Sequence, residues 1–231
     1  MKKKIVKFLM KSIIVVSIII VALYIYQGWN TYAGLLYYQF NYHKGAIPAF
    51  EKAINYNPKD AYALTYLAKI YQQRGDYDKA IKRYKELIIL FPDNVNAHYD
   101  LAFTYREKKL YNKAIEELNN VLEMDPEHLY AGYDIGFIYR DMGDIDKAIS
   151  AYKEATRVNP ECDYAYYDLG FIYKERGEID KAIEAFEGAV KANRRNPYPH
   201  YELGVLYEQL GMKKKAKKEF RRYHRYHDFG F

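Results

Sequence analysis

The second half of the sequence repeats a group of three aromatic residues and one carboxylate. The group appears as Tyr130, Tyr133, Asp134 and Phe137, and it returns twice at intervals of 34 residues, with a Glu and a Val as the only replacements. Aromatic rings pack against apolar side chains and attract cations, and carboxylates accept charge-assisted hydrogen bonds. The pattern predicts a surface that binds apolar and basic side chains of another protein. Its residues are Tyr99, Asp100, Phe103, Tyr130, Tyr133, Asp134, Phe137, Tyr164, Tyr167, Asp168, Phe171, Tyr198, Tyr201 and Glu202.

Two polar clusters have the composition of metal sites but lack a full set of ligands. The Asp-x-Asp pair at residues 76–78 recurs at 144–146, without the further ligands and the spaced Glu of a calcium loop. We interpret these pairs as helix caps. His224 and His227, with Asp228, have helical spacing but no further ligand nearby. We therefore predict no bound metal and no other cofactor.

No set of residues in the sequence predicts an enzyme. There is no glycine-rich phosphate loop and no serine or cysteine nucleophile with a base at a known spacing. Asp134 and Asp168 are both carboxylates, but nothing in the sequence indicates a closed site around them. The sequence predicts a protein that binds other proteins and does not catalyse a reaction.

The 34-residue spacing extends through most of the chain. A period in this range is typical of a solenoid, in which each unit buries its apolar face only against its neighbours. One column holds a tyrosine in every unit: Tyr37, Tyr71, Tyr105, Tyr139, Tyr173 and Tyr207. Another column holds an alanine: Ala46, Ala80, Ala114, Ala148, Ala182 and Ala216. A third holds small residues: Gly34, Ala68, Ala102, Gly136, Gly170 and Gly204.

These columns resemble the tetratricopeptide repeat, whose pattern includes a Leu-Gly pair, a Tyr, an Ala-x₃-Phe and a closing Pro. Leu169, Gly170, Tyr173, Ala182 and Phe186 match it most fully. The resemblance covers residues 27–230 without insertion or deletion, and it implies an all-α, right-handed superhelical solenoid of six helix-turn-helix units. The units are 27–60, 61–94, 95–128, 129–162, 163–196 and 197–230.

The tryptophan of the family pattern is missing from every unit. We expect this departure to change local packing and not the fold. The residues in its column are Asn30, Leu64, His98, Gly132, Tyr166 and His200.

The fifth unit shows why each block should form two helices. Gly177 is suited to the left-handed conformation that ends a helix. Asp180 is placed to accept hydrogen bonds from the free N–H groups of the second helix, and Ala182, Phe186 and Ala189 form the buried stripe of that helix.

The family architecture implies that the aromatic and acidic residues line a concave groove. Family members that grip the C-terminal carboxylate of a chaperone use lysine and asparagine at equivalent positions. This chain instead has Thr65, Lys69, Asp100, Tyr130 and Asp134, and the acids would repel a carboxylate. The predicted partner is therefore a segment with apolar and basic side chains, and not a chaperone tail or a nucleic acid.

The first 26 residues have a different composition. Five lysines precede an uncharged run over residues 12–26, followed by Trp29, and we predict a transmembrane anchor over residues 5–26. A cleaved signal peptide is the alternative, but the apolar run is not followed by a small-x-small cleavage site. The lysines predict a single-pass membrane protein with a cytoplasmic N-terminus and with the repeats on the extracytoplasmic side.

The other end of the chain is strongly basic. From Met212 onward eight basic and two acidic residues give a charge of +6, whereas residues 27–211 carry −5. A solvated outer face is what the last unit of a solenoid needs, so we interpret this segment as a cap. Contact with anionic lipid or a polyanion is the alternative. The basic terminal patch consists of Lys213, Lys214, Lys217, Lys218, Arg221 and Arg222.

Two functions fit these observations. The first is a membrane-anchored adaptor whose groove binds a segment of another protein and so organises a complex. The second is a scaffold that assembles head to tail, because the basic last helix and the acidic groove are complementary within one chain.

Overall fold

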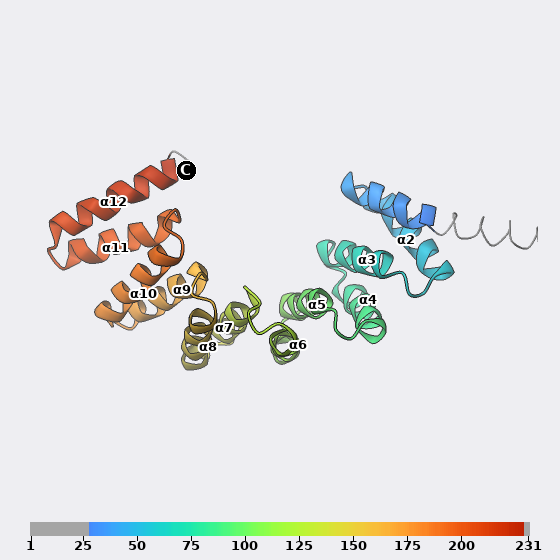
Figure 1. Cartoon of the computed structure of the whole chain (residues 1–231), viewed down its shortest axis with the longest axis horizontal. Coiled ribbons are helices and arrows are strands. Elements are labelled where there is room, and N and C mark those ends of the chain that lie inside the picture. The colour runs from blue at the N-terminus through green and yellow to red at the C-terminus, as the bar shows by residue number, and fades with distance from the viewer. Residues whose placement is uncertain (1–27, 229–231) are drawn as a thin grey trace, which may run out of the picture. The chain divides into compact units, whose positions relative to one another are not determined.

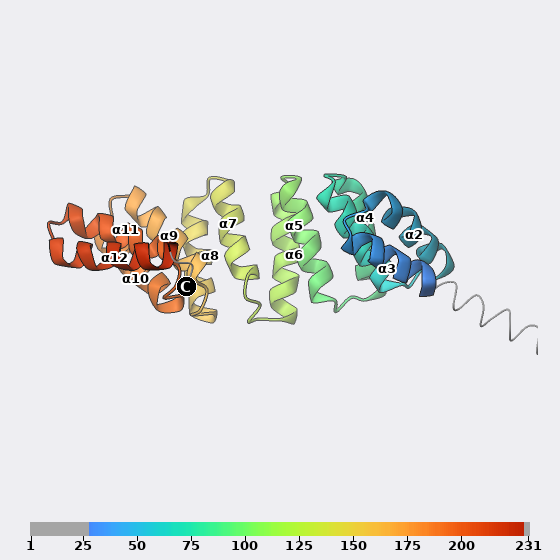
Figure 2. The same cartoon turned by 90° about the horizontal axis from the view of Figure 1, so that it is seen from above.

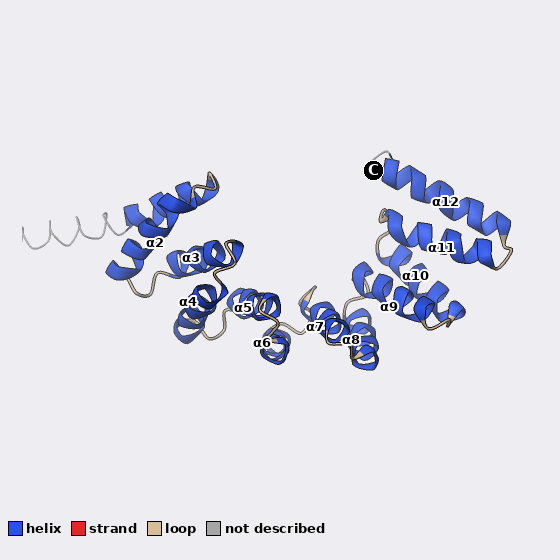
Figure 3. Cartoon of the chain, turned by 180° about the vertical axis from the view of Figure 1, so that it is seen from behind, coloured by secondary structure: helices blue, strands red, loops and turns tan. Residues whose placement is uncertain are grey.

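The computed structural model describes residues 28–228, and its regular secondary structure is entirely helical (Figure 3). The all-α prediction is confirmed for these residues. The chain divides into two compact units, residues 1–108 and 109–231. The first unit contains a helical segment over 28–39, then α2 (His43–Tyr56), α3 (Ala61–Gln73), α4 (Tyr77–Leu90) and α5 (Val95–Glu107). The second contains α6 (Tyr111–Met124), α7 (Ala131–Asp141), α8 (Ile145–Val158), α9 (Asp163–Glu175), α10 (Ile179–Ala192), α11 (Pro197–Gln209) and α12 (Lys213–Asp228).

The two helices of a block pack directly on each other. In the first unit α3 lies beside α4, and in the second unit α7 lies beside α8, α9 beside α10, and α11 beside α12 (Figures 1 and 2). The second helix of one block also packs on the first helix of the next, as α8 does on α9 and α10 on α11. The block of α9 and α10 therefore buries its apolar faces on both sides.

The turns between paired helices depend on left-handed residues. Gly177 has φ +72°, as the sequence predicted, and Gly75, Gly143 and Gly211 have φ between +71° and +80°. Glycine adopts this conformation without the steric cost that a Cβ imposes. The turn before α6 uses Lys109 instead, with φ 60°.

Helix capping differs in part from the sequence prediction. The prediction for Asp180 is wrong: this residue lies inside the first turn of α10, and the N-cap residue is Glu178, whose side chain makes no capping hydrogen bond. Asp144 does cap α8 by accepting from the Lys147 N–H. The first helices of two blocks are capped in the same way, by Asp60 on α3 and Asn94 on α5.

The core of a block is a ring of the second helix pressed against a small residue of the first. Phe186 of α10 is fully buried, and a Cβ built on Gly170 of α9 would lie 2.6 Å from two of its ring atoms. Tyr152 faces Gly136 in the same way at 2.5 Å. At Gly136 and Gly170 the small residue is thus explained by the close approach of a ring to the helix backbone.

The predicted localisation as a single-pass membrane protein is corrected by the structure. Among the residues that the structure describes, no helix combines the length and the apolar character needed to cross a bilayer. The helices α2–α12 have between 11 and 16 residues, and a span requires about 20. The predicted anchor itself, residues 5–26, lies outside the described residues.

We expect Gly170→Ala to lower the free energy of unfolding by roughly 1 kcal/mol, because overpacking against Phe186 outweighs the gain in helix propensity. Urea unfolding followed by circular dichroism measures this change. The third block carries Ala102 and Leu118 at the two equivalent positions. The double variant Gly170→Ala/Phe186→Leu should therefore cost less than the sum of its single changes. Strict additivity would contradict the ring-against-backbone explanation.

Candidate functional site

The predicted binding residues of the second unit lie on the first helix of each block or in the turn before it. Tyr133, Asp134 and Phe137 lie on α7, and their equivalents lie on α9 and α11. Four tyrosines of this set are well exposed, with exposed fractions of 42% for Tyr130, 52% for Tyr164, 56% for Tyr198 and 45% for Tyr201. We call the aromatic members the ring row. The ring row consists of Tyr130, Tyr133, Phe137, Tyr164, Tyr167, Phe171, Tyr198 and Tyr201.

Ring contacts join the blocks along this row. The ring centroid of Tyr133 lies 5.9 Å from that of Tyr164, and the centroid of Tyr167 lies 6.5 Å from that of Tyr198. Tyr133 and Tyr167 also pack inward, on Tyr152 and Phe186. In each pair one ring, Tyr133 or Tyr167, is therefore held by the core, and the ring that packs on it is exposed. The inner rings thus belong to the core, and the outer rings that pack on them face solvent.

Asp168 is not available to a partner in the way that the sequence suggested. Its carboxylate is buried, accepts hydrogen bonds from the hydroxyls of Tyr133 at 3.2 Å and Tyr152 at 3.1 Å, and pairs with Arg140 at 2.9 Å. Burial, and after it the negative charge of Asp168, raise the pKa of the hydroxyls of Tyr133 and Tyr152. Both hydroxyls thus stay protonated and act as donors.

The same pairing recurs at the next acidic position. Glu202 is buried and accepts from Lys174 of the preceding block at 2.6 Å. The cations also lie over rings, since Arg140 is 4.7 Å from the Phe137 centroid and Lys174 is 5.5 Å from the Phe171 centroid. Asp168 and Glu202 are thus each neutralised by a base from the preceding block. The sequence prediction did not include this pairing.

Three predicted residues belong to the first unit. Tyr99, Asp100 and Phe103 lie on α5, where Phe103 is exposed and Arg106 lies 4.4 Å from its ring. Asp100 pairs with Lys69 at 3.3 Å, and burial raises the pKa of its carboxyl group. Within each unit, then, an acid of the predicted set pairs with a base of the preceding block.

The bases Arg140 and Lys174 and one exposed ring were not predicted from the sequence. Arg106, Arg140 and Lys174 stand at 34-residue intervals, so the repeat spacing itself contained the signal. Tyr62, with an exposed fraction of 67%, occupies in α3 the position that Tyr164 occupies in α9.

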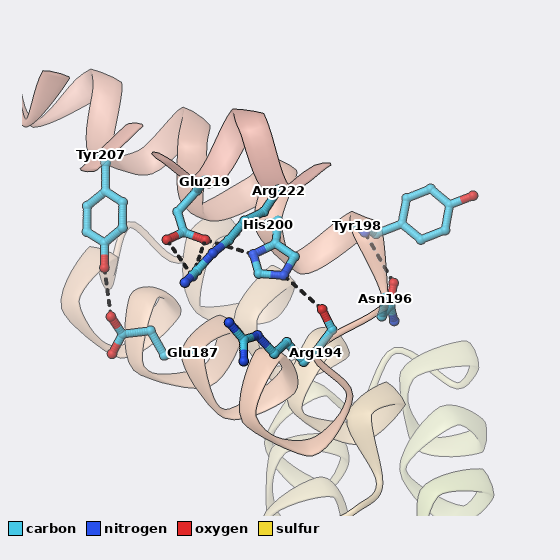
Figure 4. Close-up of polar contacts among 8 residues, drawn as sticks. All are labelled: Glu187, Arg194, Asn196, Tyr198, His200, Tyr207, Glu219 and Arg222. Atoms are coloured by element: carbon cyan, nitrogen blue, oxygen red, sulfur yellow. Dashed lines mark hydrogen bonds and ion pairs between the residues drawn. The ribbon is translucent and has the colours of Figure 1, made fainter. Parts of the chain in front are cut away.

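The basic terminal patch lies on α12 and contains one residue that is already paired. Five of its side chains are exposed, but Arg222 is half-buried and donates to Glu219 at 3.0 Å. His200 Nδ1 lies 2.7 Å from a carboxylate oxygen of Glu219, and His200 Nε2 lies 3.1 Å from the carbonyl oxygen of Arg194 (Figure 4). His200 is fully buried, so this cluster ties α12 to α11. The exposed members are Lys213, Lys214, Lys217, Lys218 and Arg221.

The histidines near the end of α12 contact an acid and not a set of ligands. Ring nitrogens of His224 and His227 lie 3.2 and 3.0 Å from the carboxylate oxygens of Asp228. Over residues 28–228 there is no group of three His, Cys, Asp or Glu side chains that could hold a metal ion.

Tyr152→Phe and Tyr84→Phe form a matched test of the buried carboxylate. Both tyrosines are fully buried at the same repeat position, but the Tyr84 hydroxyl has no hydrogen-bond partner among the described residues. We expect Tyr152→Phe to lower the free energy of unfolding by about 1 to 2 kcal/mol, and Tyr84→Phe to leave it unchanged or raise it. Chemical denaturation of both variants measures the difference. Equal losses would show that Asp168 gains nothing from the Tyr152 hydroxyl.

The attachment of α12 should weaken in acid. Burial raises the pKa of Glu219, but the hydrogen bond from His200 and the charge of Arg222 outweigh it, so the pKa lies below its usual value. A lowered carboxyl pKa stabilises the fold above the unfolded-state value, near 4.5, and this stability is lost as the pH falls through the folded-state pKa. The unfolding midpoint of the wild type should therefore approach that of Glu219→Gln below about pH 4. A gap that stays constant down to pH 3 would contradict this assignment.

Comparisons with known proteins identify the repeat. Family models described as tetratricopeptide repeat match residues 26–60, 49–82, 71–133, 133–197 and 172–226. A comparison with curated proteins found no match. A crystal structure of MamA protein is 31% identical, covers 73% of this chain and 92% of its own, and has a TM-score of 0.56.

Two further structures share the fold at lower identity. PilF of Pseudomonas aeruginosa is 16% identical, covers 90% of this chain and 98% of its own, and has a TM-score of 0.66. YrrB, described as a TPR protein with an unusual peptide-binding site, is 21% identical, covers 77% and 92%, and has a TM-score of 0.53. The matched repeats extend over nearly all of the described residues, and the chain belongs to the tetratricopeptide repeat family.

Proposed function

We propose that the chain binds an extended segment of another protein along the ring row of the second unit and thereby holds that protein in a complex. Members of the tetratricopeptide repeat family act as protein-interaction scaffolds, which gives the general mode of action. The observation that carries the specific proposal is the exposure of Tyr164 and Tyr198 next to rings that the core holds in place. Exposed aromatic residues in a row are costly in water unless a partner covers them.

The rings suit a binding surface because their positions are fixed before binding. Tyr164 rests on Tyr133, and Tyr198 rests on Tyr167, whose own ring packs on the buried Phe186. A fixed ring loses little conformational entropy when a partner arrives, so more of the contact energy remains for affinity. Peptide binding by YrrB, which has the same fold, agrees with this mode of action.

Apolar side chains are the main feature that we expect in the partner. A basic side chain would have to compete with Arg140 for Asp168, or with Lys174 for Glu202, inside ion pairs that are already formed. We therefore expect basic side chains of the partner, which the sequence predicted, to contribute less to binding than its apolar side chains. Binding that rests on ring packing should depend only weakly on salt.

Head-to-tail assembly is a second candidate function. It is favoured by the five exposed cations of the basic terminal patch, which no described acid neutralises as Glu219 does Arg222. Sedimentation of the full chain at low and high salt separates the two candidates. Association that grows with concentration and disappears at high salt supports the scaffold, and a monomer under both conditions contradicts it.

The double variant Tyr164→Ala/Tyr198→Ala tests the ring row directly. Peptides selected from a random library on the wild-type chain should be rich in apolar and aromatic residues and should bind the double variant at least about tenfold more weakly. Titration calorimetry measures both affinities. Tyr56→Ala is the control, because Tyr56 is equally exposed but lies on α2, outside the row. Selected peptides that bind all three proteins equally would refute the proposal.

A further inference from the structure

One block of the second unit lacks the side chain that fills the same place elsewhere. At the repeat position of Gly132 the neighbouring blocks place His98 and Tyr166, and the last block places the fully buried His200. Beside Gly132 lies a cavity of about 440 Å³ between α6, α7 and α8. The walls are mainly apolar and include Leu122, Leu129, Ile135, Ala151, Ala155 and Val158.

In the fifth block the repeat position of Gly132 is occupied by a tyrosine, Tyr166. There the ring of Tyr166 lies against Gly188, so close that a Cβ on Gly188 would be 2.5 Å from a ring carbon. Gly188 stands 34 residues after Glu154, which lines the cavity. The chain therefore places its own tyrosine ring, in one block, at the position that is empty in the preceding block.

The start of α7 leaves the cavity accessible. The first helices α3, α5, α9 and α11 each have 13 residues, whereas α7 has 11 and begins at Ala131. His128 caps it through Nδ1, which accepts from the Ala131 N–H at 3.2 Å. Leu129 thus lies in a turn at the mouth and is exposed.

The mouth of the cavity favours a neutral occupant. Its two charged residues, Glu154 and Arg157, form a bidentate ion pair with distances of 2.6 and 2.9 Å. Asn119 and Asn159 supply neutral amides at the same opening. An uncharged group with an apolar body and a polar end matches these walls and this rim.

We propose that this cavity, here called the Gly132 cavity, binds the aromatic side chain of a partner protein, in the manner in which the fifth block holds Tyr166. The volume suffices for a phenol ring, since an apolar cavity of about 150 Å³ can hold benzene. Tyr133 lines the cavity and also packs on Tyr164, whereas Tyr198 and its support Tyr167 do not line the cavity. A variant at Tyr198 therefore separates occupation of the cavity from the function proposed above.

The test uses p-cresol, the side-chain analogue of tyrosine, with the full-length chain. Ligand-observed NMR should show binding with a dissociation constant on the order of 1 mM. The variant Gly132→Tyr/Glu154→Gly recreates the pair of the fifth block, and it should abolish this binding. Absence of binding to the wild type, or undiminished binding to this variant, would overturn the proposal.

A second variant covers the case in which the first does not fold. Leu129→Asp changes only the exposed mouth and should weaken p-cresol binding at least fivefold. Tyr198→Ala should leave it unchanged, because Tyr198 packs on Tyr167, which does not line the cavity. The peptide acetyl-Gly-Gly-Tyr-Gly-Gly-amide distinguishes the source of the ring. Its competition with p-cresol supports a side chain of a partner. If p-cresol binds and the peptide does not compete, the cavity admits only free small molecules and the proposal is wrong.

Discussion

The close approach of a buried ring to the backbone of the neighbouring helix sets the geometry of every block that shows it. Phe186 against Gly170, and Tyr152 against Gly136, fix how near the paired helices lie. The second helix also packs on the next block. The spacing between the two helices of one block therefore affects the position of the next block within the unit. The faces of the first helices that remain outside the core are then held in register, which is why rings at 34-residue intervals can form a row.

The same packing decides what the acidic residues do. Tyr152 is part of the core, yet its hydroxyl reaches Asp168 of the next block, where Arg140 and Tyr133 complete the set of partners. A buried carboxylate is tolerated because each of its oxygens has a donor or a cation beside it. Asp168 therefore links two blocks and serves the binding surface only indirectly, by holding Tyr133 beneath Tyr164.

Variation within a repeat is most informative where a structural position changes size. The tryptophan column of the family is filled by Leu64, His98 and His200, all buried, and each block repacks around its own residue. Gly132 has no side chain to place there, and the cavity lies beside it. One block thus contributes a cavity where the others contribute core.

The repeat, its helices and the left-handed turn at Gly177 can be predicted from the sequence alone, because they depend on local conformation and on a spacing that can be counted. The sequence also located the aromatic residues and the basic last helix. The pairing of Asp168 with Arg140, the burial of Glu202 and the cavity beside Gly132 are seen only in the folded chain. These features arise from contacts between different helices, and the position of a residue within its repeat does not reveal which side chain of another helix will reach it.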